Sequence, residues 1–219
     1  DYCCAGRGHV RVYEWNGAAW IQLGNDIDGE AEVDYSGGSV SLSSDGSIVA
    51  IGAIWGNPGN GEWSGHVRVY HWNGSSWIQR GNDIDGEAEG DWSGGGQNHH
   101  MPRYASNAVS LSSDGSMVAI GALTNNGNGT HSGHVRVYHW NESVWIQRVN
   151  DIDGETAYDN SGENVSLSAD GNVVAIGAPE NDDNATDAGQ VRVYSIGSFD
   201  CSQISLLVGW PDAASDSVD

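Results

Sequence analysis

One motif occurs four times along this chain, and it constrains the fold more than any other feature of the sequence. Gly-His-Val-Arg-Val-Tyr-His-Trp spans residues 133–140 and recurs unchanged at 65–72. It also occurs at 8–15 with Glu14 in the seventh position, and in diverged form at 189–196. The copies begin 57, 68 and 56 residues apart, a period typical of architectures in which each repeat forms one supersecondary unit.

Each repeat contains the pattern of four short strands. The shared motif alternates with period two, so its valines lie on one strand face and its Arg, Tyr and Trp on the other. Asn16-Gly17 follows the first copy and predicts a tight hairpin, because both turn positions need positive φ. The remaining strand candidates are 20–22, 40–43 and 48–51, the last two flanking Asp45-Gly46. No stretch has a helical period with caps, so the sequence predicts an all-β chain.

Both faces of these strands are apolar, which indicates sheets packed on each side. Four-stranded blades stacked around an axis, as in a β-propeller, give this arrangement. The chain has ten Trp and one Phe, and Trp combines a large apolar body with a polar atom that can find a partner between blades. We expect the blade order Val-Ser-Leu-Ser, Val-Ala-Ile-Gly-Ala, His-Val-Arg-Val-Tyr, Trp-Ile-Gln, with the Asp-Ile-Asp-Gly-Glu segment crossing to the next blade.

The whole chain, 1–219, is predicted to be one propeller domain with a period of about 56 residues and about three and a half blades. Its predicted segments are a partial repeat at 8–38, repeats at 39–81, 108–149 and 164–209, an insertion at 94–107 and a tail at 210–219. A half blade leaves three alternatives: a compact four-bladed ring, completion by a partner chain, or a segment of a longer chain.

The charge excludes two classes of partner. The formal net charge is −22, from 30 acidic residues against eight Arg and no Lys. Such a surface repels nucleic acid and anionic membranes. No run approaches the ~20 apolar residues of a membrane-spanning helix, so membrane insertion is not expected.

Two features favour an extracellular location. Four sequons lie in predicted exposed turns and are candidate sites of N-linked glycans: Asn73, Asn128, Asn141 and Asn184. Unmodified turn asparagines are the alternative, and a fifth match, Asn164, opens a predicted inner strand. Cys3, Cys4 and Cys201 lie at the ends of the repeat array, where a bridge from Cys201 to Cys3 or Cys4 would join the first strand to the last. The odd thiol suggests an intermolecular disulfide.

The repeat, from Gly-His-Val-Arg-Val-Tyr to Ser-x-Asp-Gly and Val-Ala-Ile-Gly-Ala, resembles the FG-GAP repeats of integrin alpha heads and of algal and marine-bacterial surface proteins. The resemblance covers residues 8 to 196 and implies an extracellular β-propeller used in adhesion or assembly. It also implies a calcium loop of the form Asp-x-Asp-x-Asp-Gly-x-x-Asp before the Gly-Ala strand. Here Asp45, Asp114 and Asp170 are the single acids left in that loop, so we expect turns there rather than calcium sites.

Calcium is the one cofactor that the sequence suggests, through a group of acids that returns in three repeats. Carboxylates this dense could collect a hard cation. The alternative, which we favour, is that the acids hold turns or pair with the strand arginine at position 11, 68, 136 or 192. The twelve acids are Asp26, Asp28, Glu30, Asp34, Asp83, Asp85, Glu87, Asp91, Asp151, Asp153, Glu155 and Asp159.

The insertion supplies a candidate binding loop. It contains His99, His100, Arg103 and Tyr104, and specific contacts are often made by such loops. Paired histidines suggest a transition metal, although a solvated glycine-rich loop is the simpler interpretation. The strand histidines at 66, 71, 134 and 139 are expected to be packing residues.

The sequence therefore favours a non-enzymatic extracellular structural glycoprotein that self-associates into a homo-oligomer, filament or surface layer. No nucleophile elbow, Cys-His pair or phosphate loop is present in the sequence. The first alternative is an adhesion module that binds glycans or cell-surface proteins through the insertion. A propeller hydrolase or lyase is less favoured, because the acids recur in each repeat whereas an active site is normally singular.

Overall fold

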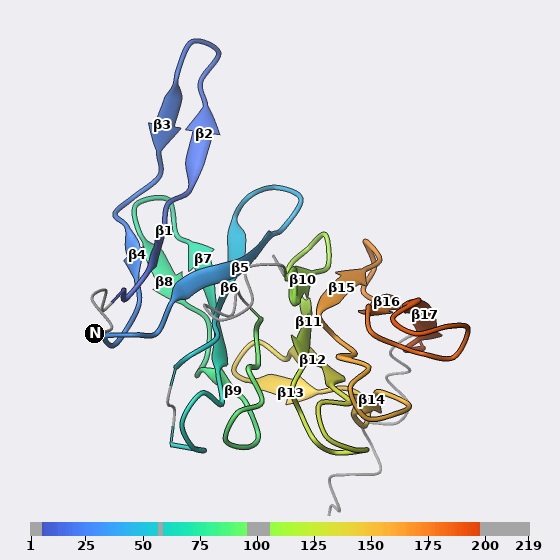
Figure 1. Cartoon of the computed structure of the whole chain (residues 1–219). Helices are drawn as coiled ribbons and strands as arrows, with labels where there is room; N and C mark the ends of the chain where they lie inside the picture. Colours follow the sequence, from blue (N-terminus) through green and yellow to red (C-terminus); the bar gives the residue numbers. More distant parts are fainter. Residues whose placement is uncertain (1–5, 57–58, 96–105, 198–219) are drawn as a thin grey trace, which may run out of the picture.

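The computed structural model describes residues 6–56, 59–95 and 106–197, and these form an all-β structure (Figure 1). The described residues contain strands β1 to β17 and no helix. It follows that none of them belongs to a helix long and apolar enough to cross a membrane.

The second repeat forms an antiparallel sheet with the strand order that the sequence predicted. The order is β5-β6-β7-β8, from the Val-Ser-Leu strand to the Trp-Ile-Gln strand, and β9 pairs with the free half of β7. The strands are β5 (Ser36–Leu42), β6 (Ile48–Ala53), β7 (His66–Trp72), β8 (Trp77–Gln79) and β9 (Ile84–Asp85).

The third repeat forms the same sheet in the same register. Ile51 faces Arg68 in the second repeat, and Ile120 faces Arg136 in the third. The strands are β10 (Val109–Leu111), β11 (Met117–Ala122), β12 (His134–Trp140), β13 (Trp145–Gln147) and β14 (Ile152–Asp153). Two identical registers confirm that the motif is a structural unit.

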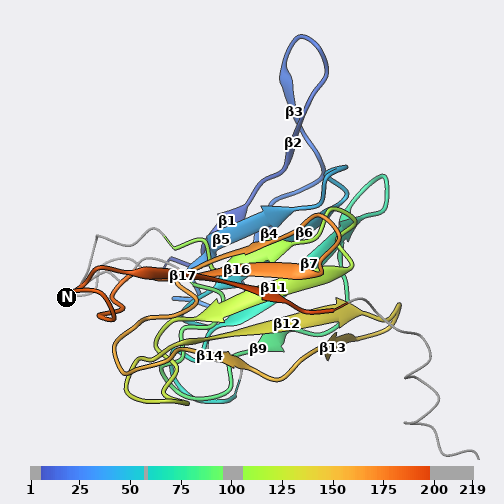
Figure 2. The same ribbon diagram turned by 90° about the vertical axis from the view of Figure 1, so that its right-hand side faces the viewer.

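The outer repeats are represented by fewer strands among the described residues. The fourth repeat is the three-stranded sheet β15 (Asn164–Leu167), β16 (Val173–Ala178) and β17 (Gln190–Ser195). In the first repeat, β1 (His9–Val10) pairs with β4 (Ile27–Asp28), and β2 (Tyr13–Trp15) pairs with β3 (Trp20–Gln22). The hairpin of β2 and β3 projects away from the other sheets in both views (Figures 1 and 2).

The prediction for the Asp-Ile-Asp segment was wrong in one respect. We expected this segment to cross to the next blade, but Ile84 and Asp85 pair with Val67 and His66 as the second half of the outer strand. Because β8 covers only the end of β7, the other end of β7 needs this partner for its backbone groups. The pairing also buries Ile84, which is 5% exposed, and the crossing begins only at Gly86.

The sheets pack face to face and share their cores. Val67 and Val69 of β7 are 0% and 1% exposed, and they belong to one apolar cluster with Val109 and Val118 of the next sheet. An equivalent cluster joins the third repeat to the fourth. Each buried valine of this kind contributes ~1.5–3 kcal/mol of transfer free energy to folding. The valine face of the motif is therefore the contact between successive repeats.

Serine hydroxyls link the innermost strands of neighbouring repeats. The N–H of Leu111 donates to Ser41 Oγ, and the N–H of Leu167 donates to Ser110 Oγ, each at 3.0 Å. An inner strand presents an edge whose N–H groups need acceptors. The serine in Val-Ser-Leu-Ser supplies that acceptor to the repeat that follows.

Tryptophans link the outer strands in the same direction along the chain. The indole N–H of Trp77 donates to the carbonyl of Leu23 at 2.9 Å, and that of Trp145 donates to the carbonyl of Arg80 at 2.8 Å. Both contacts join one repeat to the one before it. They confirm the expectation that indole groups find polar partners between repeats.

Candidate functional site

Each Asp-Gly hairpin is closed by its own carboxylate. Asp45 accepts hydrogen bonds from Ser43 Oγ at 2.7 Å and from the Ser47 N–H at 3.0 Å. The bond from Ser43, followed by those from Ser47, lowers the pKa of Asp45 to about 2. Asp114 and Asp170 make the same turn contacts. Calcium needs six to eight oxygen ligands, and each hairpin offers one carboxylate that already accepts hydrogen bonds from its own turn.

The last acid of each predicted cation cluster holds the crossing turn. Asp91 is 1% exposed and accepts from the Ala88 N–H at 3.0 Å and from Asn125 Nδ2 at 3.1 Å. Asp34 and Asp159 are also buried and accept a backbone N–H three residues earlier in the chain. Such bonds are the turn role that we favoured for these acids.

The first acid of each cluster is held by the glutamine of Trp-Ile-Gln. The Nε2–Oδ1 distance is 2.6 Å from Gln79 to Asp83 and 2.6 Å from Gln147 to Asp151. In the first repeat, Arg11 also pairs with Asp26 at 2.8 Å. The hydrogen bonds from Arg11 and then Gln22 lower the pKa of Asp26 to about 2.

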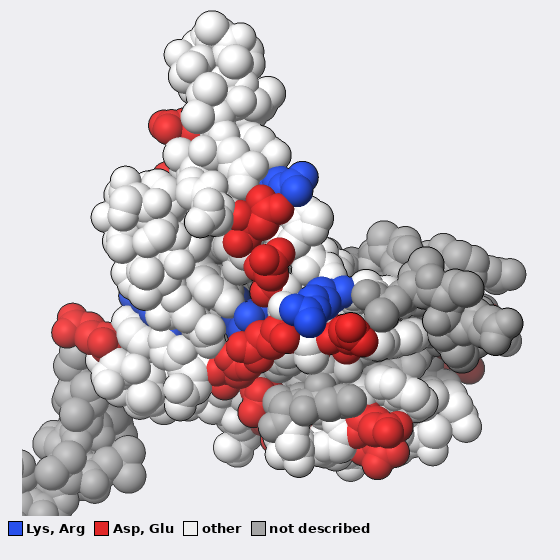
Figure 3. Space-filling view, turned by 90° about the vertical axis from the view of Figure 1, so that its left-hand side faces the viewer, with Lys and Arg blue, Asp and Glu red and all other residues white. Residues whose placement is uncertain are grey.

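The glutamate of each cluster pairs with the strand arginine of the following repeat. The pairs are Arg68–Glu30 at 3.5 Å, Arg136–Glu87 at 3.6 Å, and Arg192–Glu155. Arg136 is 5% exposed, and its Nη2 also donates to the Asp85 carbonyl at 2.7 Å. Figure 3 shows acidic and basic side chains next to one another in a band across one face of the molecule. With Arg11–Asp26, each described copy of the strand arginine thus has the acidic partner that we expected. The other three pairs join two successive repeats.

The histidines at the start of β7 and β12 lie beside these acids, a position that sequence reasoning did not predict. His66 and His134 are 3% and 1% exposed. Both nitrogens of His66 and Nε2 of His134 are buried and have no hydrogen-bond partner among the described residues. A buried polar atom without a partner costs ~1–3 kcal/mol. The available sequence signal was the second residue of the motif, which is His in three copies and Gln190 in the fourth.

An open cleft lies beside one of these histidines. Its volume is about 790 Å³, and Glu30, Trp55, Trp63, His66 and Asp83 are among the residues that line it. The cleft spans the boundary between the first and second repeats. It connects the buried imidazole to solvent and offers aromatic rings at its wall.

Strands β5 and β17 expose residues whose counterparts in the third repeat are buried between repeats. Val40 and Leu42 of β5 are 47% and 50% exposed, whereas their counterparts Val109 and Leu111 are 0% and 7% exposed. The neighbouring β6 is covered on this side by the first repeat, so only the inner strand of the second sheet is exposed there. Val191 and Val193 of β17 are 70% and 66% exposed. The counterparts of these last two, Val135 and Val137, are both 0% exposed. We name these surfaces the β5 face and the β17 face.

The four candidate glycosylation sites are all exposed, but they differ in the use of the side-chain nitrogen that would carry the glycan. In Asn73 and Asn141 the side-chain oxygen accepts N–H groups of the hairpin turn. Asn128 Nδ2 donates to the carbonyls of Gly154 and Glu155, and Asn60 Nδ2 makes the equivalent bond to Gly86. Asn128 therefore has a structural role, while Asn73 and Asn141 leave the nitrogen without a hydrogen bond to any described residue.

Two groups of predicted site residues lie outside the described residues. These are the three cysteines at positions 3, 4 and 201 and the insertion residues His99, His100, Arg103 and Tyr104. Residues 198–209, the last part of the repeat predicted at 164–209, also lie outside them. All of these remain predictions.

No family model matches the chain, and no curated protein matches it. Several solved structures are similar. One is described as "Complex of KlAtg21 with coiled-coil of AgAtg16", with TM-score 0.48, 15% identity, and 84% of this chain and 46% of that chain covered. Another is "Structure of U3-55K", with TM-score 0.44, 13% identity, and coverages of 85% and 49%.

A third similar structure is "Crystal structure of the tricorn protease", with TM-score 0.42, 8% identity, and coverages of 87% and 17%. The chain thus spans less than half the length of each of these three proteins. Likeness at this level carries no functional information. The packed antiparallel sheets of the chain itself define its class: an all-β, propeller-type fold built from four-stranded repeats.

Proposed function

We propose that this protein is a non-enzymatic structural protein that self-associates head to tail through the β5 face and the β17 face. The observation that carries this proposal is that each face is the counterpart of one side of a repeat–repeat contact inside the chain. Val191 and Val193 correspond to Val67 and Val69, and Val40 and Leu42 correspond to Val109 and Leu111; these four counterparts belong to one buried apolar cluster. The β17 face of one copy would therefore meet the β5 face of a second copy at the part of that sheet that the first repeat leaves uncovered.

Polar groups on the two faces fit the same contact. Inside the chain, Ser41 Oγ accepts from Leu111 N–H, and Ser110 Oγ accepts from Leu167 N–H. By the same spacing, the exposed Ser166 of one copy would accept from Leu42 N–H of the next. The hairpin of β2 and β3 adds Trp15 and Trp20, which are 52% and 67% exposed.

Contacts between two different faces need not close, so they generate either a ring or a filament. The acidic surface, the exposed sequons and the terminal cysteines support placing this assembly outside the cell, as a filament or surface layer. N-linked glycans at Asn73, Asn141 and Asn184 would lie on exposed residues, and a disulfide from Cys201 to Cys3 or Cys4, or between copies, would reinforce the array.

Two single-face variants test the assembly. Leu42→Asp introduces a charge into the β5 face, and Val193→Asp introduces one into the β17 face. Each variant alone should be monomeric by sedimentation velocity. A contact needs an intact β5 face on one copy and an intact β17 face on another, and all copies of one variant have the same face altered. An equimolar mixture should form one-to-one dimers and nothing larger, since each variant keeps the face that the other lacks.

The matched control is Ile146→Asp, which changes an apolar residue that is 41% exposed on β13, outside both faces. This variant should assemble as the wild type does. A wild type that remains monomeric at high protein concentration, or a mixture of the two face variants that stays monomeric, would contradict the proposal.

One observation favours a second candidate, an adhesion module that binds carbohydrate. Trp55 and Trp63 line the open cleft beside the carboxylates of Glu30 and Asp83. Aromatic rings can stack on the apolar faces of sugars while carboxylates accept hydroxyl hydrogen bonds. Titration of soluble oligosaccharides should then quench tryptophan fluorescence, and Trp63→Ala should abolish the quenching. An unchanged spectrum across a broad oligosaccharide panel would exclude this candidate.

A further inference from the structure

We propose that the chain carries two equivalent binding sites for a divalent transition-metal ion of the Zn²⁺ type, each at the boundary between two repeats. Each site combines a histidine and an aspartate of one repeat with a glutamate of the repeat before it. The sites are Glu30–His66–Asp83 and Glu87–His134–Asp151. In each, one possible ligand atom from every residue lies within 4.8 Å of the other two.

The buried histidines are what distinguish these sites from ordinary surface acids. His66 and His134 are 3% and 1% exposed, and no residue in the described part of the chain makes a hydrogen bond to either His66 nitrogen or to His134 Nε2. Polar atoms in this state are rare in native proteins and indicate an unfilled requirement. In His134 the other ring nitrogen, Nδ1, is the one that faces the two carboxylates of the cluster.

The distances in the second site fit a central ion better than direct bonds. His134 Nδ1 lies 3.8 Å from Glu87 Oε2 and 4.0 Å from Asp151 Oδ2, too far for hydrogen bonds. Ligand atoms at ~2.0–2.2 Å from a tetrahedral ion lie about 3.4 Å apart. Closure around an ion would thus shorten the two distances from His134 Nδ1 by about 0.4 and 0.6 Å.

Neighbouring side chains hold each carboxylate with one oxygen and leave the other for the site. Gln147 Nε2 donates to Asp151 Oδ1, while Asp151 Oδ2 faces His134. Arg136 Nη1 lies beside Glu87 Oε1, while Glu87 Oε2 faces His134. Such outer contacts orient the ligands of natural metal sites. Gln79 and Arg68 repeat these contacts for Asp83 and Glu30.

The mixed nitrogen and oxygen ligands select the kind of ion. Calcium and magnesium prefer oxygen ligands, whereas imidazole with carboxylates suits zinc and related transition metals. Three protein ligands leave at least one coordination position for water or for a group of a bound partner. At the first site that position is reached through the open cleft beside His66.

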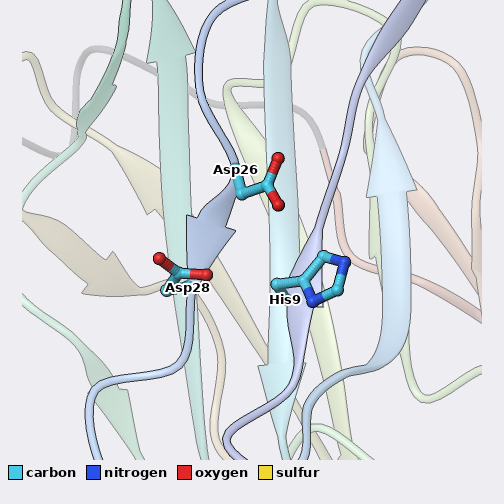
Figure 4. Close-up of side chains that lie close together, drawn as sticks. All are labelled: His9, Asp26 and Asp28. Carbon is cyan, nitrogen blue, oxygen red and sulfur yellow. The ribbon is translucent and has the colours of Figure 1, made fainter.

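The first and fourth repeats show what a site needs. In the first, His9, Asp26 and Asp28 come close (Figure 4), but all three are exposed. Asp26 is also already paired with Arg11. In the fourth, Gln190 replaces the histidine and Glu155 pairs with Arg192. We therefore expect two tight sites per chain rather than four.

The test is zinc stoichiometry of the full, tag-free chain, measured by competition with a chromophoric chelator. Wild type should bind two more ions than the double variant, and His66→Gln and His134→Gln should each bind one more than the double variant. Gln is the residue that the fourth repeat itself carries at this position. Cobalt loading should give visible d–d absorption in the wild type, and this band should halve in each single variant.

Two controls separate loss of ligation from loss of folding. His71→Gln changes another histidine on β7, outside the clusters, and should bind as many ions as wild type. Glu30→Gln and Glu87→Gln alter half-exposed carboxylates and should weaken their own site about tenfold or more without changing the circular dichroism spectrum. A wild type that binds no zinc, a double histidine variant that binds as much as wild type, or calcium displacing zinc at equal concentration would overturn the proposal.

Discussion

Gly81 lies directly against Trp140: a Cβ built on Gly81 would come within 2.7 Å of Cζ3 of this indole. Gly24 has the same relation to Trp72, also at 2.7 Å. In the next repeat the glycine is replaced by Val149, and the tryptophan position is occupied by Ile196. Both of these residues pack against the cluster shared by the third and fourth repeats. At the boundary between the third and fourth repeats, the larger Val149 in place of glycine thus accompanies the smaller Ile196 in place of tryptophan.

We expect Gly81→Ala to destabilise the protein by ~2–4 kcal/mol, because the new Cβ both meets Trp140 and is strained at φ +81. Gly90→Ala separates these causes, since Gly90 has φ +78 but a Cβ added there would have no neighbour within 4 Å. It should cost only ~1 kcal/mol. Urea denaturation of the two variants measures the difference, and equal losses would show that the indole contact is unimportant.

Trp145→Phe should cost ~1–2 kcal/mol, because it removes the indole donor to the Arg80 carbonyl and leaves that carbonyl without its inter-repeat partner. Trp20→Phe is the matched control, since Trp20 occupies the same position in the first repeat but is 67% exposed. It should change the free energy of unfolding by less than ~0.5 kcal/mol. Thermal and urea unfolding of both variants provide the comparison.

Arg136→Ala should be among the most damaging single substitutions, at ~3 kcal/mol or more. Arg136 is 5% exposed, and its removal strips the Asp85 carbonyl of a donor and Glu87 of its cation. Arg11→Ala removes the arginine at the same strand position in the first repeat, where its side chain is 45% exposed. That loss should stay below ~1 kcal/mol. A similar cost for both would contradict the structural difference between the two pairs.

Acid should remove the contribution of the Asp-Gly hairpins between about pH 4 and pH 2. Hydrogen bonds from Ser168 and then Asn172 lower the pKa of Asp170 to about 2, below the ~3.9 of an unfolded aspartate. The unfolded chain therefore binds the proton first, so this stabilisation is present above pH 4 and lost as pH falls toward 2. The difference in the free energy of unfolding between wild type and Asp170→Asn should be largest near pH 5 and should disappear by pH 2.

The strand pattern of each repeat could be predicted from sequence because it depends on neighbouring residues. Period-two alternation and the Asn-Gly and Asp-Gly turns are local, and they predicted the order of β5 to β8. The partner of the strand arginine was also expected, since a buried charge requires one. That the partner is the glutamate of the preceding repeat depends on how two sheets stack, which no local pattern encodes.

The same limit explains what was missed at the candidate metal sites. His66 was assigned to packing, and it is buried, but its unpartnered nitrogens become evident only when Glu30 and Asp83 are seen beside it. Residues 30 and 66 are brought together by the crossing between sheets. Ile84 was misplaced for a related reason, because the short β8 leaves half of β7 open and only the sheet shows this.

The serine and tryptophan contacts described above and three of the four arginine–acid pairs run between one repeat and the next; the exception is Arg11–Asp26, within the first repeat. Ser41 meets Leu111, Trp145 meets Arg80, and Arg136 meets Glu87. Duplicating one period of the gene would therefore copy both halves of every such contact at once. A longer descendant would inherit complete junctions without a single compensating mutation, whereas deletion of part of a period would leave unmatched residues on two neighbouring sheets.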